Sequence, residues 1–388
     1  MLKSAIAHLK RPLLLSWGKD LDPQANGAEP LSNGTKPLSN GTNGGNGAEP
    51  PAERLSNGTN GGKGAEPPAE PPAEPLSNDT NGGQGAEPPR GKGALPPQDH
   101  DEYQYLALIR DIGLEGVYET GRNGIAKTVF GSAMHFSLAD GTMPILTTKA
   151  VAWRTCFKEL MWFINGSTDN AILQKQGVKI WNGNATRDFL DAQGLSEMQE
   201  NDLGPVYGHQ WRHFNAPYST CHTDYHGQGV DQLATIIELL LNPATRGSRR
   251  LILSAWNPSQ LQQMALPPCH VLAQFHVTEG RYLSCSLYQR SGDVGLGVPF
   301  NISSYCFLTH LLAHHCGLEA KEFLYYLGNC HIYDDHEAIL QQQLVRQPFP
   351  FPQLRFKMKH AAIEAYTLDD LELTNYQCHA SIKMEMRP

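Results

Sequence analysis

Apolar residues recur at helix or strand spacing only from about residue 103 to the C-terminus. In DEYQYLALIRDIGLEG, the apolar side chains from Tyr105 to Ile112 follow helical intervals, which predicts a first helix ending near Gly113. AVAWRTCFKELMWFINGST shows the same spacing and stops at Asn165-Gly166, which predicts a second helix.

Two further segments have helical periodicity. VDQLATIIELLLNP is predicted to be a helix that ends at Asn242-Pro243. NISSYCFLTHLLAHHCGL is predicted to be a helix capped by Gly317.

Strand spacing separates these helices. KTVFGSAMHFSL alternates as short strands, and RRLILSAWNP, CHVLAQFHV and YLSCSLYQRS also read as strands. Residues 278–281, Thr-Glu-Gly-Arg, would join the last two as a hairpin. Because strands and helices do not alternate regularly as βαβ units, the pattern predicts an α+β domain rather than a doubly wound sheet.

The first hundred residues have no such periodicity. Between Asp20 and Asp101 the only large apolar residues are leucines, and the near-copies LSNGTNGGKGAEPP and LSNDTNGGQGAEPP repeat within Gly-, Pro- and Asn-rich sequence. Such a segment cannot bury enough surface to offset its chain entropy. We therefore expect two regions, a disordered repeat extension over 1–100 and one folded catalytic domain over 101–388.

Composition restricts the class of protein. The net charge of −8 argues against generic nucleic-acid binding. The eight cysteines lack CxxC spacing, which is typical of a reducing compartment, and no apolar run is long enough for a membrane span. We expect the cytoplasm, with the nucleus or mitochondrion as alternatives, because residues 1–19 contain Lys and Arg but no acid, as a targeting peptide would.

Cys269 is the first candidate for chemistry. It follows Pro267-Pro268 and precedes His270 at the start of a predicted strand. A lone cysteine there is more often structural, but a nucleophilic thiol needs cationic neighbours that favour its anion. Arg249, Arg250 and Arg290 end or begin neighbouring strands; they would be either a solvated edge or, with Ser291, an anion site.

Polar residues elsewhere admit two interpretations each. In QRSGDVGLGVPFN, a Gly-rich entry to a helix can hold an anion or form only a loop, and Asn301 can cap that helix or read a base. In GNCHIYDDH, a metal site is the less favoured reading, since no second cluster has matching spacing. We therefore predict no metal. Trp181 and Tyr207 could simply cover a core edge.

Seven segments together resemble one family, thymidylate synthase, in the family's order. They are KELMWFINGST, DLGPVYGHQWRHF, LILSAWNP, ALPPCHVLAQFHV, LYQRSGDVGLGVPFNI, LGNCHIY and SIKMEM. The resemblance covers about residues 105–388 and excludes the repeats. It implies a mixed, twisted β-sheet with surrounding helices and a homodimer that packs sheet to sheet.

The resemblance also implies an activity, the methylation of dUMP to dTMP. The carbon donor and reductant would be 5,10-methylenetetrahydrofolate, which leaves as dihydrofolate. Cys269 would be the nucleophile that adds to uracil C6, so that C5 can attack the one-carbon unit. The cosubstrate is the only cofactor we expect, and binding to its own mRNA is a further partner that the family suggests.

The same resemblance implies a role for each site residue. Glu159, Tyr207 and His270 would relay protons, and Asp293 would serve both catalysis and pterin binding. Folate would contact Ile180, Trp181, Asn184, Asp293, Leu296, Gly297 and Phe300. The dUMP site would comprise Arg122, Arg249, Arg250, Gln289, Arg290, Ser291, Asn301, His331 and Tyr333, with Arg249 and Arg250 reaching the phosphate of the other subunit.

Three positions depart from the family's pattern. The loop GRNGIAKT, which carries Arg122, is one residue shorter than expected; Asn182 replaces an acid; and the chain ends in Arg387-Pro388 instead of small apolar residues. A poorer lid would let water reach the reactive carbon. Two alternatives therefore stay open, a dUMP hydroxymethylase on the same fold and a catalytically weak nucleotide- or RNA-binding relative.

Overall fold

A computed structural model describes residues 100–387 of the chain. The expectations for residues 1–99, including their disorder, lie outside the described residues. Among residues 100–387 no helix combines the length and apolarity that a membrane crossing requires.

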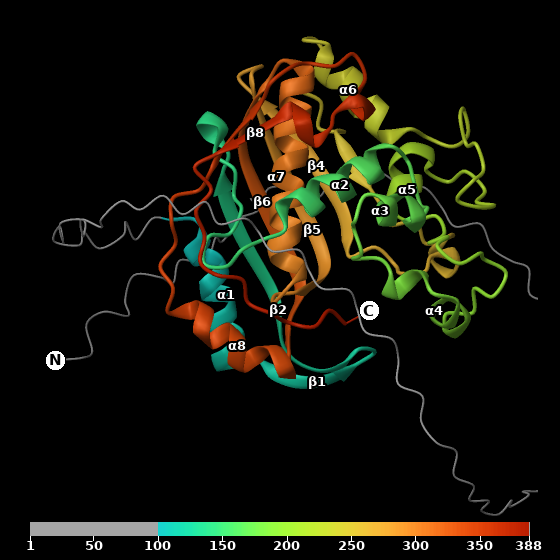
Figure 1. The fold of residues 1–388 in the computed structure, drawn as a ribbon. Coiled ribbons are helices and arrows are strands. Elements are labelled where there is room, and N and C mark those ends of the chain that lie inside the picture. The colour runs from blue at the N-terminus through green and yellow to red at the C-terminus, as the bar shows by residue number, and fades with distance from the viewer. Residues whose placement is uncertain (1–99, 388) are drawn as a thin grey trace, which may run out of the picture. The chain divides into compact units, whose positions relative to one another are not determined.

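A six-stranded mixed sheet forms the centre of the domain (Figure 1). Its strand order is β1 (Val117–Gly121), β2 (Gly124–Ser137), β6 (Glu319–Tyr333), β5 (Tyr282–Asp293), β4 (His270–Thr278) and β3 (Ile252–Ser254). Neighbours pair antiparallel except β5 and β6, which are parallel. A separate antiparallel pair joins β7 (Gln353–Phe356) to β8 (Leu371–Thr374).

Eight α-helices accompany these strands in the described part of the chain. They are α1 (Glu102–Glu115), α2 (Trp153–Ile164), α3 (Asn170–Lys175), α4 (Arg187–Ala192), α5 (Tyr207–His213), α6 (Gln232–Leu241), α7 (Gly297–Cys316) and α8 (Asp334–Leu344). The α+β class and the mixed sheet are thus as predicted.

The four predicted helices and the β4–β5 hairpin are present, with two differences. Helix α7 begins at Gly297, ahead of the predicted start, because Pro299 in its first turn needs no amide donor. The predicted short strands over 127–138 are one 14-residue strand, β2. Gly131 adopts φ +90° within it, which lets the strand continue through an irregular position.

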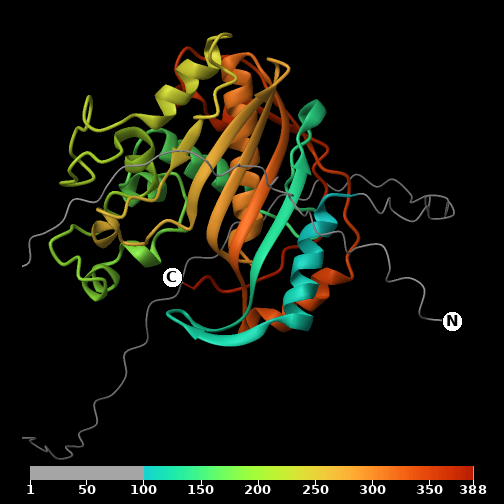
Figure 2. The same cartoon turned by 180° about the vertical axis from the view of Figure 1, so that it is seen from behind.

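Helix α7 covers one face of the sheet, and its residues from Ile302 to Leu312 are mostly buried. Phe323, Tyr325 and Leu327 of β6 are buried on that side. The cross-strand partners Tyr288 and Tyr326 are 41% and 44% exposed. In Figure 2, where the molecule is seen from behind, strands β4, β5 and β6 lie on the side turned toward the viewer. One sheet face therefore forms the core, and the other carries accessible apolar side chains.

Glu102 fixes α1 to the loop that leads into the site. Its carboxylate is buried and accepts hydrogen bonds from the backbone amides and hydroxyls of Thr147 and Thr148, over 2.6–3.0 Å. Four donors, which make five hydrogen bonds, compensate for the cost of burying this charge. The loop continues to Lys149, which lines the cleft described below.

Candidate active site

A cleft with a volume of about 1070 Å³ opens beside the ends of β4, β5 and β6. Its wall includes every predicted site residue except Arg249 and Arg250. Those two arginines are exposed just before β3, outside the cleft of the single chain. The fold therefore gathers residues from position 122 to the C-terminal tail around one space.

The two prolines before Cys269 hold an arginine. Arg290 donates from Nε to the Pro268 carbonyl over 2.9 Å and from Nη2 to the Pro267 carbonyl over 2.8 Å. The Arg290 amide donates to the Cys269 carbonyl over 3.0 Å. These two carbonyls therefore orient the guanidinium beside the thiol segment.

Burial raises the pKa of the Cys269 thiol, and the charges of Arg290 and then Arg122 act in the opposite direction. The arginines lower the thiol pKa, as the sequence predicted, but in the single chain the opposing effect of burial is larger. Tyr207 fixes the backbone here, because its hydroxyl accepts a hydrogen bond from the Cys269 amide over 2.8 Å. The thiol is thus a positioned, protonated group with cations nearby.

Glu159 extends from α2 into the cleft wall and is buried. Burial raises its pKa to about 7, although the hydrogen bond from Trp181 Nε1 favours the charged form. A carboxyl group with this pKa can both give and accept a proton near neutral pH. Trp181, predicted as a folate contact, therefore also orients Glu159.

His270 stays neutral near pH 7. Burial lowers its pKa to about 4, and the nearby Asn301 side chain acts in the opposite direction. Its ring centroid lies 5.0 Å from that of Tyr207. Burial likewise raises the pKa of Tyr207, with the Cys269 charge acting in the same direction. Both groups can therefore orient water or carry a neutral hydrogen bond, but neither is ionised.

A chain of hydrogen bonds fixes the orientation of Asn301. The Tyr325 hydroxyl donates to Gln289 Oε1 over 2.6 Å, and Gln289 Nε2 donates to Asn301 Oδ1 over 3.0 Å. Gln289 Nε2 also donates to the Ser291 carbonyl over 2.8 Å. The Asn301 side chain, buried in α7, thus has an assigned acceptor and donor end. Tyr325 is a supporting residue that sequence reasoning missed.

The ends of β5 and β6 complete this wall. Asp293 Oδ1 accepts from the Gly295 amide over 2.9 Å, which shapes the turn into α7. His331 Nδ1 lies 2.9 Å from Asn329 Oδ1. Burial lowers the pKa of His331, while the Asp293 charge raises it. Asn329 was not predicted, because nothing in its spacing distinguishes it from an ordinary turn residue.

Lys149 is a second residue that the sequence reasoning missed. It is buried at the cleft and donates from Nζ to the Gly295 carbonyl. Burial lowers its pKa to about 8, while Asp293 and Glu102 raise it. Nothing in residues 147–149, Thr-Thr-Lys, marks this lysine as a buried cation. Its role becomes visible only when the fold brings it near Asp293.

The residues weighed as metal ligands have other partners. Asp334 and Asp335 accept hydrogen bonds from Arg387, over 2.9 and 2.7 Å, and His336 Nε2 lies 2.9 Å from the Glu385 carbonyl. Asn182, one of the departures, has its Oδ1 bonded to Asn170 Nδ2 over 3.2 Å and lies outside the cleft wall. Each of these side chains thus has a hydrogen-bonding partner in the described part of the chain.

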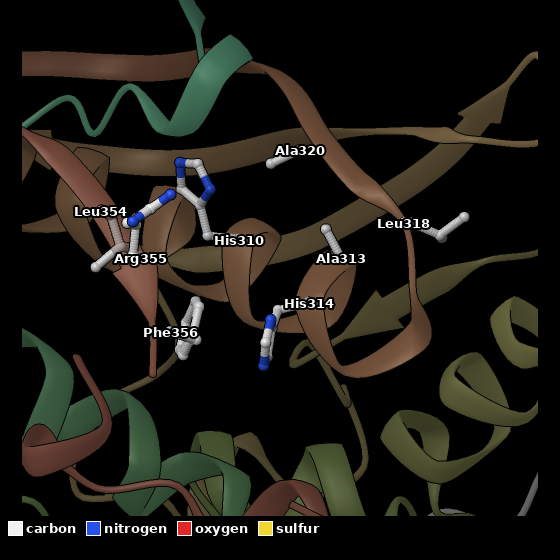
Figure 3. A pocket seen from close by; sticks show the side chains of 8 residues that line it. All are labelled: His310, Ala313, His314, Leu318, Ala320, Leu354, Arg355 and Phe356. Carbon is white, nitrogen blue, oxygen red and sulfur yellow. The ribbon is translucent and has the colours of Figure 1, made fainter. Parts of the chain in front are cut away.

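A smaller pocket of about 370 Å³ lies between α7 and β7 (Figure 3). His310, His314 and Arg355 contribute its polar groups. His310 Nε2 lies 2.9 Å from the Thr142 carbonyl, and His314 Nε2 lies 3.0 Å from the Met358 carbonyl. Since none of the predicted site residues lines it, the larger cleft is the candidate active site.

A family model described as thymidylate synthase matches residues 103–388, so the chain belongs to that family. It is 52% identical over 289 residues to thymidylate synthase of Equine herpesvirus 2, covering 74% of this chain and 98% of the viral protein. It is 50% identical over 288 residues to that of Human herpesvirus 8, covering 74% and 84%.

The chain is also similar to longer proteins. It is 51% identical over 290 residues to a bifunctional dihydrofolate reductase-thymidylate synthase of Paramecium tetraurelia, covering 74% of this chain and 62% of that protein. The corresponding Arabidopsis thaliana protein, at 49% identity, is covered over 55% of its length. The chain thus spans less than two thirds of these bifunctional relatives.

Proposed function

We propose that this protein methylates dUMP to dTMP with 5,10-methylenetetrahydrofolate, yielding dihydrofolate. The observation that carries the proposal is the convergence of Cys269, Arg290, Asn301 and Glu159 on one cleft. A thiol beside a phosphate-binding cation, an amide with a fixed orientation and an acid with pKa near 7 match what nucleophilic addition to a uracil nucleotide requires.

In the first step, Arg290 and Ser291 bind the phosphate and bring uracil C6 to the Cys269 sulfur. The thiol loses its proton to solvent, the S–C6 bond forms, and the C5–C6 π electrons move toward O4. Arg290 and Arg122 both favour the thiolate, so they act in the direction that this step needs. C5 thereby becomes nucleophilic, which it is not in free uracil.

Glu159, Tyr207 and His270 would then act on protons at the ring. Glu159 can exchange a proton with water at O4 because its pKa is about 7. Neutral His270 and Tyr207 would orient that water. Asn301 would pair with the uracil edge through its amide, since uracil offers one donor and one acceptor there.

The other half of the cleft suits a reduced folate. Ile180, Trp181, Leu296 and Phe300 supply apolar surface, and Asp293 supplies a carboxylate within that lining. A flat, polar-edged pterin would pack on the former and hydrogen-bond to the latter. When bound, the folate supplies the one-carbon unit and the hydride; the chain's own residues orient it and exclude water.

We also propose that the protein is a homodimer packed through the exposed face of the sheet. Ile252, Tyr288 and Tyr326 on that face are each more than 40% exposed. Arg249 and Arg250 lie just before β3, where their exposed side chains are accessible to a second copy. In a sheet-to-sheet dimer their guanidinium groups would reach the phosphate site of the other subunit.

The decisive experiment incubates the protein with dUMP and 5,10-methylenetetrahydrofolate and measures the mass of the nucleotide product. dTMP, formed with one dihydrofolate per turnover, supports the proposal, and Cys269→Ser should abolish it. A product heavier by one oxygen would identify the hydroxymethylase, and nucleotide binding without turnover would identify the inactive relative. The compartment and binding to its own mRNA stay predictions from the sequence.

A further inference from the structure

The C-terminal tail forms part of the cleft wall. Ile382, Met384, Met386 and Arg387 line the cleft, and Met384 packs against the hydrophobic core. The tail is drawn in red and ends at the label C (Figure 1). Within residues 382–387 the backbone is held where the Glu385 carbonyl lies 2.9 Å from His336 Nε2.

Arg387 has four partners on three other segments. Its Nη2 donates to Asp334 and Asp335 at the start of α8, over 2.9 and 2.7 Å, and its Nη1 donates to the Asn123 carbonyl over 3.0 Å. Its guanidinium carbon lies 5.0 Å from the centre of the Tyr333 ring. We call Arg387, Asp334 and Asp335 the tail cluster.

The β1–β2 turn leaves space for this arginine. Gly124 has φ +109°, and a Cβ at that position would overlap the Arg387 guanidinium. Asp334 and Asp335 occupy the first turn of α8, where acids also interact favourably with the helix dipole. Two acids, a carbonyl and an aromatic face thus converge on a single cation from the last described residue of the chain.

We infer that Arg387 is a positioning residue that holds the tail over the cleft by binding Asp334 and Asp335. The inference deepens the proposed function, on which its kinetic consequence rests. Small apolar residues, which the family resemblance led us to expect at this end, could make none of these charge-assisted hydrogen bonds. In this chain the side chain of Arg387 ties the tail to α8 and to the β1–β2 turn.

The cluster is partly exposed, so its effect is moderate. The side chains of Arg387, Asp334 and Asp335 are 26%, 46% and 44% exposed. An ion pair in that setting changes an equilibrium by about 5-fold at most. This is large enough to alter how often the tail opens but too small to affect folding of the domain.

Trypsin measures tail opening without any turnover. Lys383 is exposed but lies inside the tail, and cleavage after it releases residues 384–388, while the Arg387–Pro388 bond resists the protease. When opening is fast relative to cleavage, the release rate follows the open population. Arg387→Ala should raise that rate about 5-fold in the ligand-free protein, and Arg387→Lys, which keeps the charge but loses the fork of donors, should fall between.

A double-mutant cycle tests the partners. The isosteric pair Asp334→Asn and Asp335→Asn should raise the release rate as Arg387→Ala does, and combining all three changes should add little. The control is Arg355→Ala, which removes an exposed arginine of β7. Unchanged release in Arg387→Ala, or effects that simply multiply in the triple variant, would overturn the inference.

Kinetics supply the second readout. In Arg387→Ala we expect the folate KM to rise about 5-fold and kcat to fall less, because a more open tail weakens folate binding. Absence of dTMP formation in the wild-type protein would reject the proposed activity and leave the trypsin result intact. Normal release with altered kinetics would instead reject the positioning role.

Discussion

Trp181 Nε1 donates a hydrogen bond to Glu159 Oε1 over 2.7 Å, inside a wall where both side chains are buried. A carboxylate with one neutral donor is undersolvated, so its charged form is disfavoured. The pair thus connects Trp181, in the apolar part of the cleft wall, to Glu159, the acid that would exchange protons with the substrate.

The raised pKa of Glu159 makes stability depend on pH. Its pKa is about 7 in the folded protein against 4.5 for a free group. The contribution of Glu159 to the free energy of unfolding is therefore fully present below pH 4.5. It falls by roughly 3 kcal/mol as the pH rises through 7. Glu159→Gln keeps the acceptor for Trp181 and removes the titration.

Urea unfolding at pH 5 and pH 8 checks this prediction. The wild-type protein should lose roughly 3 kcal/mol more than Glu159→Gln over that interval. Glu372→Gln, which alters an exposed glutamate of β8, serves as the matched control and should retain the wild-type pH dependence. Equal pH slopes for Glu159→Gln and wild type would contradict the assigned burial effect.

The elements that the sequence predicted are those with local signals. Helix α2 has helical apolar spacing and a stop at Asn165-Gly166, and the β4–β5 hairpin has a Gly-containing turn. Strand β1 is exposed along its whole length and has no apolar face to reveal it. The parallel pairing of β5 with β6 depends on α7 crossing between them, a long-range relationship that spacing does not encode.

The site residues also fall into those that the sequence predicted and those that it did not. Cys269 and Arg290 stood out through local chemistry, and the resemblance joined them to residues far along the chain. Tyr325 and Lys149 went unnoticed because their roles arise from burial and from partners, Gln289 and the Gly295 carbonyl, that only the fold brings near. The net rise of the thiol pKa was missed for the same reason.

Arg122 affects the reactivity of Cys269. Its charge lowers the pKa of the thiol against the larger effect of burial. Removing that charge in Arg122→Gln should raise the pKa further, so alkylation at pH 7.5 should be slower and the rate profile should move to higher pH. Peptide mass spectrometry should follow Cys269 itself, because Cys221 and Cys378 are also partly exposed.

Arg110→Gln controls for the loss of a positive charge elsewhere, since Arg110 is exposed on α1. Its alkylation profile should match that of the wild-type protein. If Arg122→Gln also matches the wild type, the shortened β1–β2 turn does not bring the guanidinium close enough to act on the thiol.

Asn301→Asp should change which base is accepted. Gln289 Nε2 already donates to the side-chain oxygen of Asn301, so the substitution replaces the outward amide donor by an acceptor. We expect kcat/KM for dUMP to fall about 10- to 100-fold, the effect of an unpaired polar contact, and dCMP to bind better relative to dUMP. Measuring both nucleotides on one preparation separates altered recognition from general loss of activity; equal losses for both would contradict it.

Arg249 and Arg250 allow a direct test of the proposed dimer. Cys269→Ser and the double variant Arg249→Ala/Arg250→Ala should each be nearly inactive alone. If the arginines serve the other subunit, a mixed dimer contains one site with an intact thiol and intact arginines. After subunits are exchanged at equal amounts, half of the dimers are mixed, so activity should recover to about a quarter of the wild-type value. No recovery, despite mixed dimers seen by native mass spectrometry, would mean that these arginines act within their own chain or not at all.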